Sequence, residues 1–325
     1  MACRYGAGEQ PIEAMLPSGG SSPTLTIGLD VVEPGNYEIS LSDETGKRNV
    51  IVHIPPAYDG SLKLPLLIAL HGGAGSGQHI QRLSRLDADA DEYGFMVAYP
   101  DGSGRLDDSL LTWNAGHCCG YALENGVDDV AFIDLLIDRL ISHYAVDPAR
   151  VYLTGISNGG MMTYRAGAEL AEKVAGIAPI AGSIGGRTSE GEFEIVPAAP
   201  SSPVSVIAFH GMLDQHVLFD GGIGPEEIEE GRVDISVQGS ISFWLDANAC
   251  DLVPEREFQA DDNIVIETYG GCNSGVEVVL VTIVDGGHAW PGARRGLVSD
   301  QPTQDISANQ MMLEFFLAHP KEAAD

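Results

Sequence analysis

The chain has 325 residues, and its 44% hydrophobic content is enough for the core of one large domain or two small ones. It contains 17 Lys and Arg against 47 Asp and Glu, a formal net charge of −30, so we expect it to repel DNA, RNA and anionic membranes and to favour neutral substrates. Because no run of about 18 apolar residues occurs, no integral membrane segment is expected.

The beginning of the chain is rich in Gly, Ser and Pro, which predicts a flexible N-terminal segment over residues 1–35. It lacks the apolar centre of a signal peptide. We therefore expect a cytosolic protein, or an exported one whose leader has been removed. Cys3 would fit a truncated lipoprotein.

Two stretches that follow, Tyr37–Leu41 and Asn49–Ile54, alternate apolar with polar residues and predict an antiparallel hairpin. Pro65–Leu70 and Phe95–Tyr99 are continuous apolar runs, as in strands buried on both faces. A helix over Ile80–Tyr93 is predicted between them, with Gly94 at its end.

A long loop is predicted from Ser103 to about Val127, and loops of that length tend to be functional. Asp128 and Asp129 then begin an amphipathic helix. Further strands and helices alternate along the rest of the chain: strands over 174–181, 204–209, 264–269 and 276–284, and helices over 235–249 and 307–318.

This alternation predicts an α/β fold whose central sheet is mostly parallel, with helices on both faces and an antiparallel N-terminal edge. That layout is the α/β-hydrolase fold. No internal repeat or linker is apparent, so we expect a single domain over residues 36–320.

The stretch from Val151 to Met162 contains Gly155-Ile156-Ser157-Asn158-Gly159 between an apolar run and a helical one. A nucleophile elbow requires that order, because it holds the serine hydroxyl above the sheet at a helix N-terminus. Side chains at Gly155 or Gly159 would collide with the neighbouring strand and helix. The alternative is a plain strand-to-helix connection in which Ser157 caps the helix.

An acid and a histidine should follow the serine, each after a later strand. Asp214 is the first acid after the strand over 204–209, and His288 follows the strand over 276–284. We predict that they complete a catalytic triad with Ser157. Asp220 is the alternative acid, and Asp285 lies too close to His288 along the chain to orient it.

Two backbone N–H groups should stabilise an oxyanion: that of Asn158, after the nucleophile, and one from the loop after Leu70. In that loop Gly73 is the first candidate and Ala74 the second. A phosphate-binding loop over 72–77 is the competitor, but the Gly-Lys-Ser/Thr ending is missing. Histidines at strand ends, such as His71 and His210, more often brace loops than act as bases.

The five cysteines are Cys3, Cys118, Cys119, Cys250 and Cys272. A bridge between the last two would close a loop of 22 residues and stabilise the fold by about 3 kcal/mol. Cys118 and Cys119 could form a vicinal disulfide or remain buried thiols. No spacing fits a zinc site, so no metal and no cofactor are expected. The cysteine content favours an oxidising, extracytoplasmic location.

Several motifs recur in one known family in this order. They are Leu70-His71-Gly72-Gly73; Trp113-Asn114-Ala115-Gly116 with Cys118-Cys119-Gly120; Val127-Asp128-Asp129-Val130; Asp147-Pro148-x-Arg150-Val151-Tyr152 running into Gly155-Ile156-Ser157-Asn158-Gly159-Gly160-Met161-Met162; Phe209-His210-Gly211-x-x-Asp214; and Gly286-Gly287-His288-Ala289-Trp290-Pro291-Gly292. From about residue 37 to 319 the chain resembles the polyhydroxybutyrate depolymerase/feruloyl esterase family, which includes acetyl xylan esterases of carbohydrate esterase family 1 and LpqC-like lipoproteins.

The resemblance implies an α/β-hydrolase with the triad named above, and secretion, a periplasmic location or lipoprotein anchoring. It also implies a Cys250–Cys272 disulfide, and Trp113 and Trp290 as walls of the substrate site. Ordinary packing is the alternative for both tryptophans. His71, Ala74 and His216 complete the candidate substrate-binding residues, which are Trp113, Trp290, His71, Ala74 and His216.

The sequence thus predicts a metal-independent serine carboxylesterase that forms an acyl-enzyme. Feruloyl (hydroxycinnamoyl) esters of plant polysaccharide are the first substrate expected, followed by polyhydroxybutyrate or other polyester oligomers and by acetyl xylan. A polymeric ester is therefore a possible partner. A serine peptidase of the same fold, or a non-catalytic binding protein, are the hypotheses from other classes.

Overall fold

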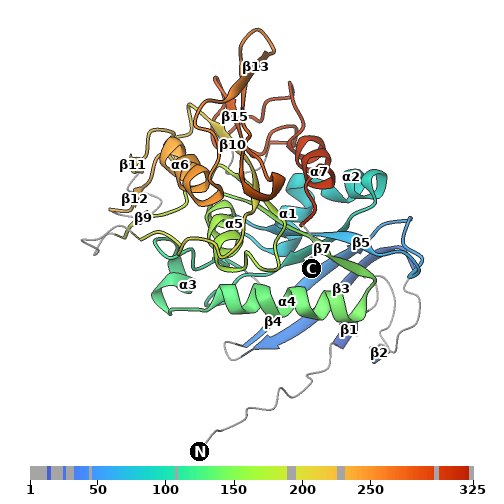
Figure 1. Ribbon diagram of the computed structural model, residues 1–325. Helices are drawn as coiled ribbons and strands as arrows, with labels where there is room; N and C mark the ends of the chain where they lie inside the picture. The colour runs from blue at the N-terminus through green and yellow to red at the C-terminus, as the bar shows by residue number, and fades with distance from the viewer. Residues whose placement is uncertain are drawn as a thin grey trace, which may run out of the picture.

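The computed structural model describes residues 13–15, 25–26, 33–43, 46–106, 109–188, 195–224, 231–295 and 300–321 (Figure 1). Most of the predicted N-terminal segment, residues 1–35, lies outside these ranges, so its flexibility stays a prediction. The same is true of residues 225–230 in the acidic stretch that follows Asp214.

One large mixed sheet forms the centre of the molecule, and a small sheet lies beside it (Figure 1). The strands are β1 (Glu13–Met15), β2 (Leu25–Thr26), β3 (Gly35–Asp43), β4 (Gly46–Ile54), β5 (Leu64–Leu70), β6 (Met96–Pro100), β7 (Val146–Ile156), β8 (Gly176–Ile180), β9 (Gly186–Arg187), β10 (Ser205–Gly211), β11 (Gly222–Ile223), β12 (Val233–Asp234), β13 (Glu255–Gln259), β14 (Ile264–Tyr269) and β15 (Val278–Ile283).

The large sheet has 12 strands in the order β13-β14-β15-β10-β8-β7-β5-β6-β4-β3-β1-β2. From β15 to β6 all neighbours are parallel. The predicted hairpin is confirmed as β3 and β4, which pair antiparallel and adjoin β6. A second antiparallel edge, β14 with β13, was not expected. Its outer strand reads Glu-Arg-Glu-Phe-Gln and is exposed throughout, so it lacks the apolar run by which buried strands are recognised.

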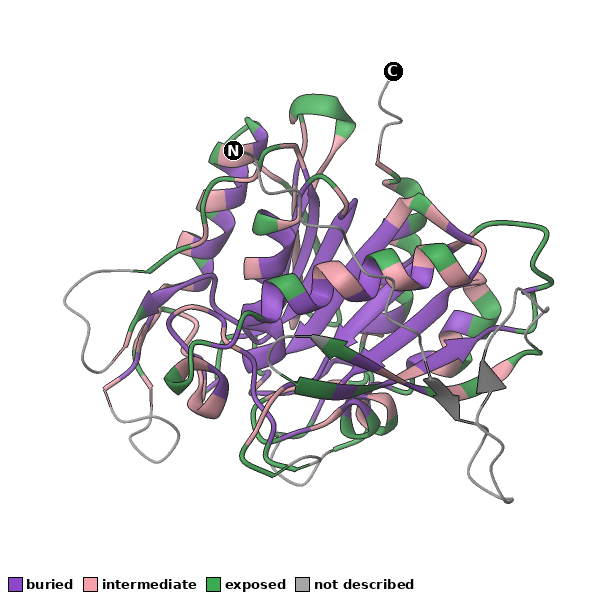
Figure 2. Ribbon diagram, turned by 90° about the horizontal axis from the view of Figure 1, so that it is seen from below, coloured by how far each residue is buried: buried purple, intermediate pink, exposed green. Residues whose placement is uncertain are grey.

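Helices cover both faces of the sheet, as predicted (Figure 2). Buried side chains of α4 (Asp129–His143), α5 (Asn158–Glu169) and α6 (Val237–Asn248) share one core cluster with Leu66, Ile68 and Leu70 of β5. Those of α1 (Gly77–Ser84), α2 (Leu86–Tyr93) and α7 (Ala308–Ala318) share the other with Leu67 and Ala69. The alternation along β5 therefore divides one apolar run between two cores.

Two predicted elements differ in the structure. The helix over Ile80–Tyr93 is instead α1 and α2, which Arg85 separates in a left-handed conformation with φ 56°. The long loop from Ser103 to Val127 contains a short helix, α3 (Gly120–Glu124). The prediction missed the break because Arg85 carries none of the usual Gly or Pro signals for a helix end.

Candidate active site

Ser157 lies in the turn between β7 and α5, with φ 58° and ψ −125°. A non-glycine residue adopts that conformation only when the surroundings impose it, and such residues concentrate at functional sites. Ser157 is partly exposed, whereas its neighbours from Val151 to Gly160 are all buried. The turn thus presents one hydroxyl at the carboxyl edge of the parallel sheet, as a nucleophile elbow does.

The two glycines of the elbow are required for steric reasons. A Cβ on Gly155 would lie 2.5 Å from the carbonyl oxygen of Gly159, and one on Gly159 would overlap the carbonyl oxygens of Leu70 and His71. The close approach of β5, β7 and α5 therefore depends on the absence of side chains here.

Asp214 and His288 lie together at the same edge of the sheet. Asp214 follows β10 and His288 follows β15, and these strands are parallel neighbours. The Nδ1 atom of His288 is 2.7 Å from Oδ2 of Asp214, and both side chains are buried. The alternative acids, Asp220 and Asp285, are exposed. With β8 as the one strand between β7 and β10, the topology brings the serine, the acid and the histidine to one edge.

Asp214 is held as a carboxylate. Its other oxygen, Oδ1, accepts hydrogen bonds from the backbone N–H groups of His216 at 2.8 Å and Val217 at 2.9 Å. Burial acts to raise the pKa of Asp214, but the hydrogen bond and charge of His288, the charge of His210 and the Val217 N–H together hold that pKa below its ordinary value. A carboxylate in this state can orient an imidazole and stabilise its protonated form.

The loop after β5 lies against the elbow. A Cβ on Gly72 would be 3.4 Å from Cβ of Ser157, and one on Gly73 would be 3.9 Å from Cβ of Asn158. Gly73 and Ala74 are exposed, and Ala74 has a left-handed φ of 60°. The predicted oxyanion donors, on Gly73 and Asn158, thus come from segments that touch each other.

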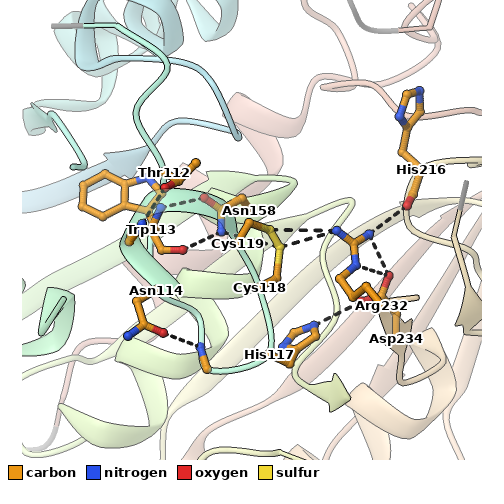
Figure 3. Close-up of a disulfide and its surroundings, with 12 residues drawn as sticks. Thr112, Trp113, Asn114, His117, Cys118, Cys119, Asn158, His216, Arg232 and Asp234 are labelled. Atoms are coloured by element: carbon orange, nitrogen blue, oxygen red, sulfur yellow. Dashed lines mark hydrogen bonds and ion pairs between the residues drawn. A yellow bond between two sulfur atoms is a disulfide. The ribbon is translucent and has the colours of Figure 1, made fainter. Parts of the chain in front are cut away.

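Asn158 also fixes the loop that contains Trp113 (Figure 3). Its Oδ1 accepts from the Trp113 N–H at 2.7 Å, and its Nδ2 donates to the Trp113 carbonyl at 2.9 Å. Trp113 Nε1 in turn donates to the His71 carbonyl at 3.0 Å. One chain of hydrogen bonds therefore joins the two segments that carry the candidate oxyanion donors.

The structure corrects the expectation that Trp113, Trp290 and His71 contact substrate. Trp113 is 0% exposed and Trp290 is 1% exposed, and Trp290 Nε1 donates to Asn309 Oδ1. His71 is also buried, with Nδ1 facing the Gly72 carbonyl and Nε2 accepting from the Gly102 N–H. Their aromatic character identified them as candidates, but packing and loop bracing account for all three side chains.

Among the remaining candidates, Ala74 and His216 lie near the triad and are not buried. The His216 ring stands 4.8 Å from the His288 ring, between centroids. Cys250 and Cys272 form a disulfide, as the resemblance implies, and it joins the end of α6 to the segment after β14. Cys118 and Cys119 are also joined (Figure 3).

A buried polar cluster that sequence reasoning missed lies beside Cys118 and Cys119 (Figure 3). Arg232 Nη2 pairs with Asp234 Oδ2 at 3.0 Å, and Asp234 Oδ1 lies 3.1 Å from His117 Nε2. Arg232 Nη1 lies 3.4 Å from Cys118 Sγ. These residues are far apart along the chain and follow no period, so only their three-dimensional pairing identifies them.

Among the described residues, no group of three His, Cys, Asp or Glu side chains could hold a metal ion. None of the helices in the described ranges has the length and apolarity that crossing a membrane requires.

The fold and this constellation define an α/β-hydrolase with a serine, acid and histidine at the carboxyl edge of its sheet. Residues 49–188 match the family model of Esterase PHB depolymerase, and this segment is a domain of that family. The chain as a whole belongs to the carboxylic ester hydrolases of the α/β-hydrolase fold, because its relatives are named esterases.

Feruloyl esterase B of Piromyces equi is 31% identical over 77% of the chain, which spans 44% of that protein's length. The putative esterase NocK of Nocardia uniformis subsp. tsuyamanensis is 29% identical over 78% of the chain and 74% of its own length. The solved acetyl xylan esterase of Aspergillus awamori, 18% identical, superposes over 85% of this chain and 97% of its own with a TM-score of 0.56, which shows the shared fold.

Proposed function

We propose that the protein is a serine carboxylesterase that works through an acyl-enzyme. The proposal rests above all on one observation: a 2.7 Å contact between Asp214 Oδ2 and His288 Nδ1, at the sheet edge where the elbow presents Ser157. Nδ1 faces a carboxylate and so carries the proton, which leaves Nε2 free to act as a base.

In the proposed reaction, the Ser157 hydroxyl attacks the ester carbonyl while His288 Nε2 takes its proton. Asp214 keeps the imidazole in the required tautomer and stabilises the imidazolium that forms. The N–H groups of Asn158 and Gly73 stabilise the oxyanion. His288 then protonates the leaving alcohol, and water activated by the same imidazole releases the acid from Ser157.

For the substrate we propose hydroxycinnamoyl esters of plant polysaccharide, because feruloyl esterase B is the relative with the highest identity reported above. The second candidate is a polyester oligomer such as oligomeric 3-hydroxybutyrate, which the family match over residues 49–188 favours. Since Trp113 and Trp290 are buried, an aromatic acyl group would have to be recognised by other side chains.

We also propose that residues 36–320 form one catalytic domain and that the protein acts in an extracytoplasmic, oxidising compartment. The Cys250–Cys272 disulfide supports that location, because such bonds persist where thiols are not kept reduced.

The decisive comparison is kcat/KM on methyl ferulate and on soluble 3-hydroxybutyrate oligomers, with Ser157→Ala as the blank. Ser157→Ala should lower kcat by roughly 10⁴- to 10⁶-fold. Ser142→Ala, an exposed serine in α4, is the matched control and should keep full activity. Near-normal turnover by Ser157→Ala would refute the mechanism.

The substrate preference decides between the two ester classes. Faster cleavage of methyl ferulate supports the hydroxycinnamoyl proposal, whereas faster cleavage of the oligomers supports polyester degradation. Activity on neither, with a clear rate on p-nitrophenyl acetate, would contradict both and point to acetyl esters. Cleavage of aminoacyl amides in preference to all esters would point to a peptidase.

A further inference from the structure

The side chain of His216 lies against the candidate catalytic histidine. The two ring centroids are 4.8 Å apart and the ring planes are inclined by 35°, a tilted stack. His216 is partly exposed, whereas the His288 side chain is 9% exposed. His216 thus lies between the imidazole of the triad and the surface, two residues after the acid of the triad.

The backbone of His216 is fixed on both sides. Its N–H donates to Asp214 Oδ1 at 2.8 Å, and its carbonyl accepts from Arg232 Nη2 at 3.1 Å (Figure 3). Arg232 is itself buried and ion-paired with Asp234 of β12. The ring of His216 is therefore attached to a segment that a buried charged cluster immobilises.

The other contacts of His288 leave one degree of freedom to be restrained. Asp214 holds Nδ1 at the ring edge, and Asp300 Oδ2 accepts from the His288 backbone N–H at 2.7 Å. These contacts fix one ring atom and the backbone, but they allow the imidazole to tilt about its Asp214 contact. A ring stacked on its face opposes that tilt, and the tilt determines where Nε2 points.

We propose that His216 is a positioning residue that stacks on His288 and holds its Nε2 atom toward Ser157. The inference rests on the proposed triad and deepens it. His216 acts through His288 and need not touch the substrate, so its contribution belongs to kcat and not to KM.

The charge on His216 matters for this role. The titratable and charged groups that face it are His288 and Asp214, Asp300 beside the His288 backbone, and Arg232. Burial and the charge of His288 lower the pKa of His216, against the opposite influence of Asp214 and Asp300. Near neutral pH the His216 ring is therefore uncharged, and it does not repel the imidazolium that forms on His288 in each half of the reaction.

The first test compares three variants on p-nitrophenyl acetate. His216→Ala removes the stacked ring and should lower kcat roughly 10- to 100-fold with little change in KM. His216→Phe keeps an aromatic face and should retain most of kcat. His143→Ala, a distant histidine at the end of α4, is the matched control and should behave as the wild type.

The second test is the pH profile of kcat/KM for the wild type and His216→Phe. In acid the wild-type His216 gains a positive charge that faces His288, whereas phenylalanine cannot. His216→Phe should therefore retain a larger fraction of its own maximal kcat/KM at pH 5 than the wild type does. A role in packing alone would leave the two normalised profiles superimposed.

Three results would overturn the proposal: an unchanged kcat in His216→Ala, an equal loss of kcat in the Ala and Phe variants, or an effect confined to KM. The last would assign His216 to substrate binding. Failure of the esterase proposal itself would be recognised separately, because the wild type would then hydrolyse no ester or Ser157→Ala would remain active.

Discussion

On the nucleophile side of the site, between β5 and α5, the groups that fix the geometry are neutral. Backbone amides, the Asn158 side chain, the Trp113 indole and an uncharged His71 form one chain of hydrogen bonds. On the acid–base side, after β10 and β15, titratable groups do this work. There Asp214, His210, His216 and Asp300 surround His288.

The two sides therefore respond differently to pH and to mutation. Substitutions on the neutral side should change stability and leave the protonation chemistry unaltered, because no proton moves there. Substitutions on the acid–base side should change kcat and its pH dependence, because each group there influences the charge that His288 acquires. The following predictions, from the largest effect to the smallest, test this division.

Asp214→Asn should have the largest effect of these. An amide cannot enforce the His288 tautomer or stabilise the imidazolium, so kcat should fall by about 10⁴-fold with a nearly unchanged fold. Asp220→Asn, the exposed acid nearby, is the matched control. Steady-state kinetics with circular dichroism would check both. Comparable losses in the two variants would contradict the assignment of Asp214.

Acid should destabilise the fold through the neutral side. Burial lowers the pKa of His71 from 6.5 to about 4, although its hydrogen bond to Gly72 opposes this shift. As pH falls from 6.5, the unfolded chain binds this proton before the folded one does. Stability is thus complete above pH 6.5 and declines down to about pH 4, by at most about 3 kcal/mol from this group.

Burial also lowers the pKa of His210, and this shift has the same sign. The lowered pKa of Asp214 acts in a separate window, below its ordinary value of 3.8, so the histidine loss can be measured alone. Urea unfolding at pH 7, 5 and 4 is the measurement. An unfolding free energy that stays constant between pH 6.5 and 4 would show that the folded state accommodates a charged His71.

Trp113→Phe should have the smallest effect. It removes the donor to the buried His71 carbonyl and should lower the free energy of unfolding by about 1–3 kcal/mol. KM for methyl ferulate should not change, because the indole is buried. Trp244→Phe is the matched control, since Trp244 is equally buried but its Nε1 has no hydrogen-bond partner within the described residues. A selective rise in KM for ferulate in Trp113→Phe would restore Trp113 as a wall of the site.

The parallel core and its site order were predictable because they depend on local signals. A buried strand is a continuous apolar run, the elbow needs small residues around Ser157, and the order of strands places Asp214 and His288 at one edge. The helix break at Arg85 and the edge strand β13 were not predictable, because Arg85 is no helix breaker and β13 is charged and exposed.

Side-chain roles were harder to predict than positions along the chain. Trp113, Trp290 and His71 were expected at the substrate because of their residue types, but burial decides against it. The Arg232–Asp234 pair could not be inferred at all, since nothing local in the sequence links these residues to Cys118 or His216. Exposure and pairing are properties of the packed structure.

The most direct test of the account is covalent labelling with a fluorophosphonate, followed by intact-mass measurement of the wild type and Ser157→Ala. The account predicts one phosphonyl group on the wild type, located on the peptide that contains Ser157, and none on Ser157→Ala. Labelling should slow in parallel with kcat in Asp214→Asn. An unlabelled wild type, or equal labelling of both proteins, would contradict the claim that Ser157 is an activated nucleophile.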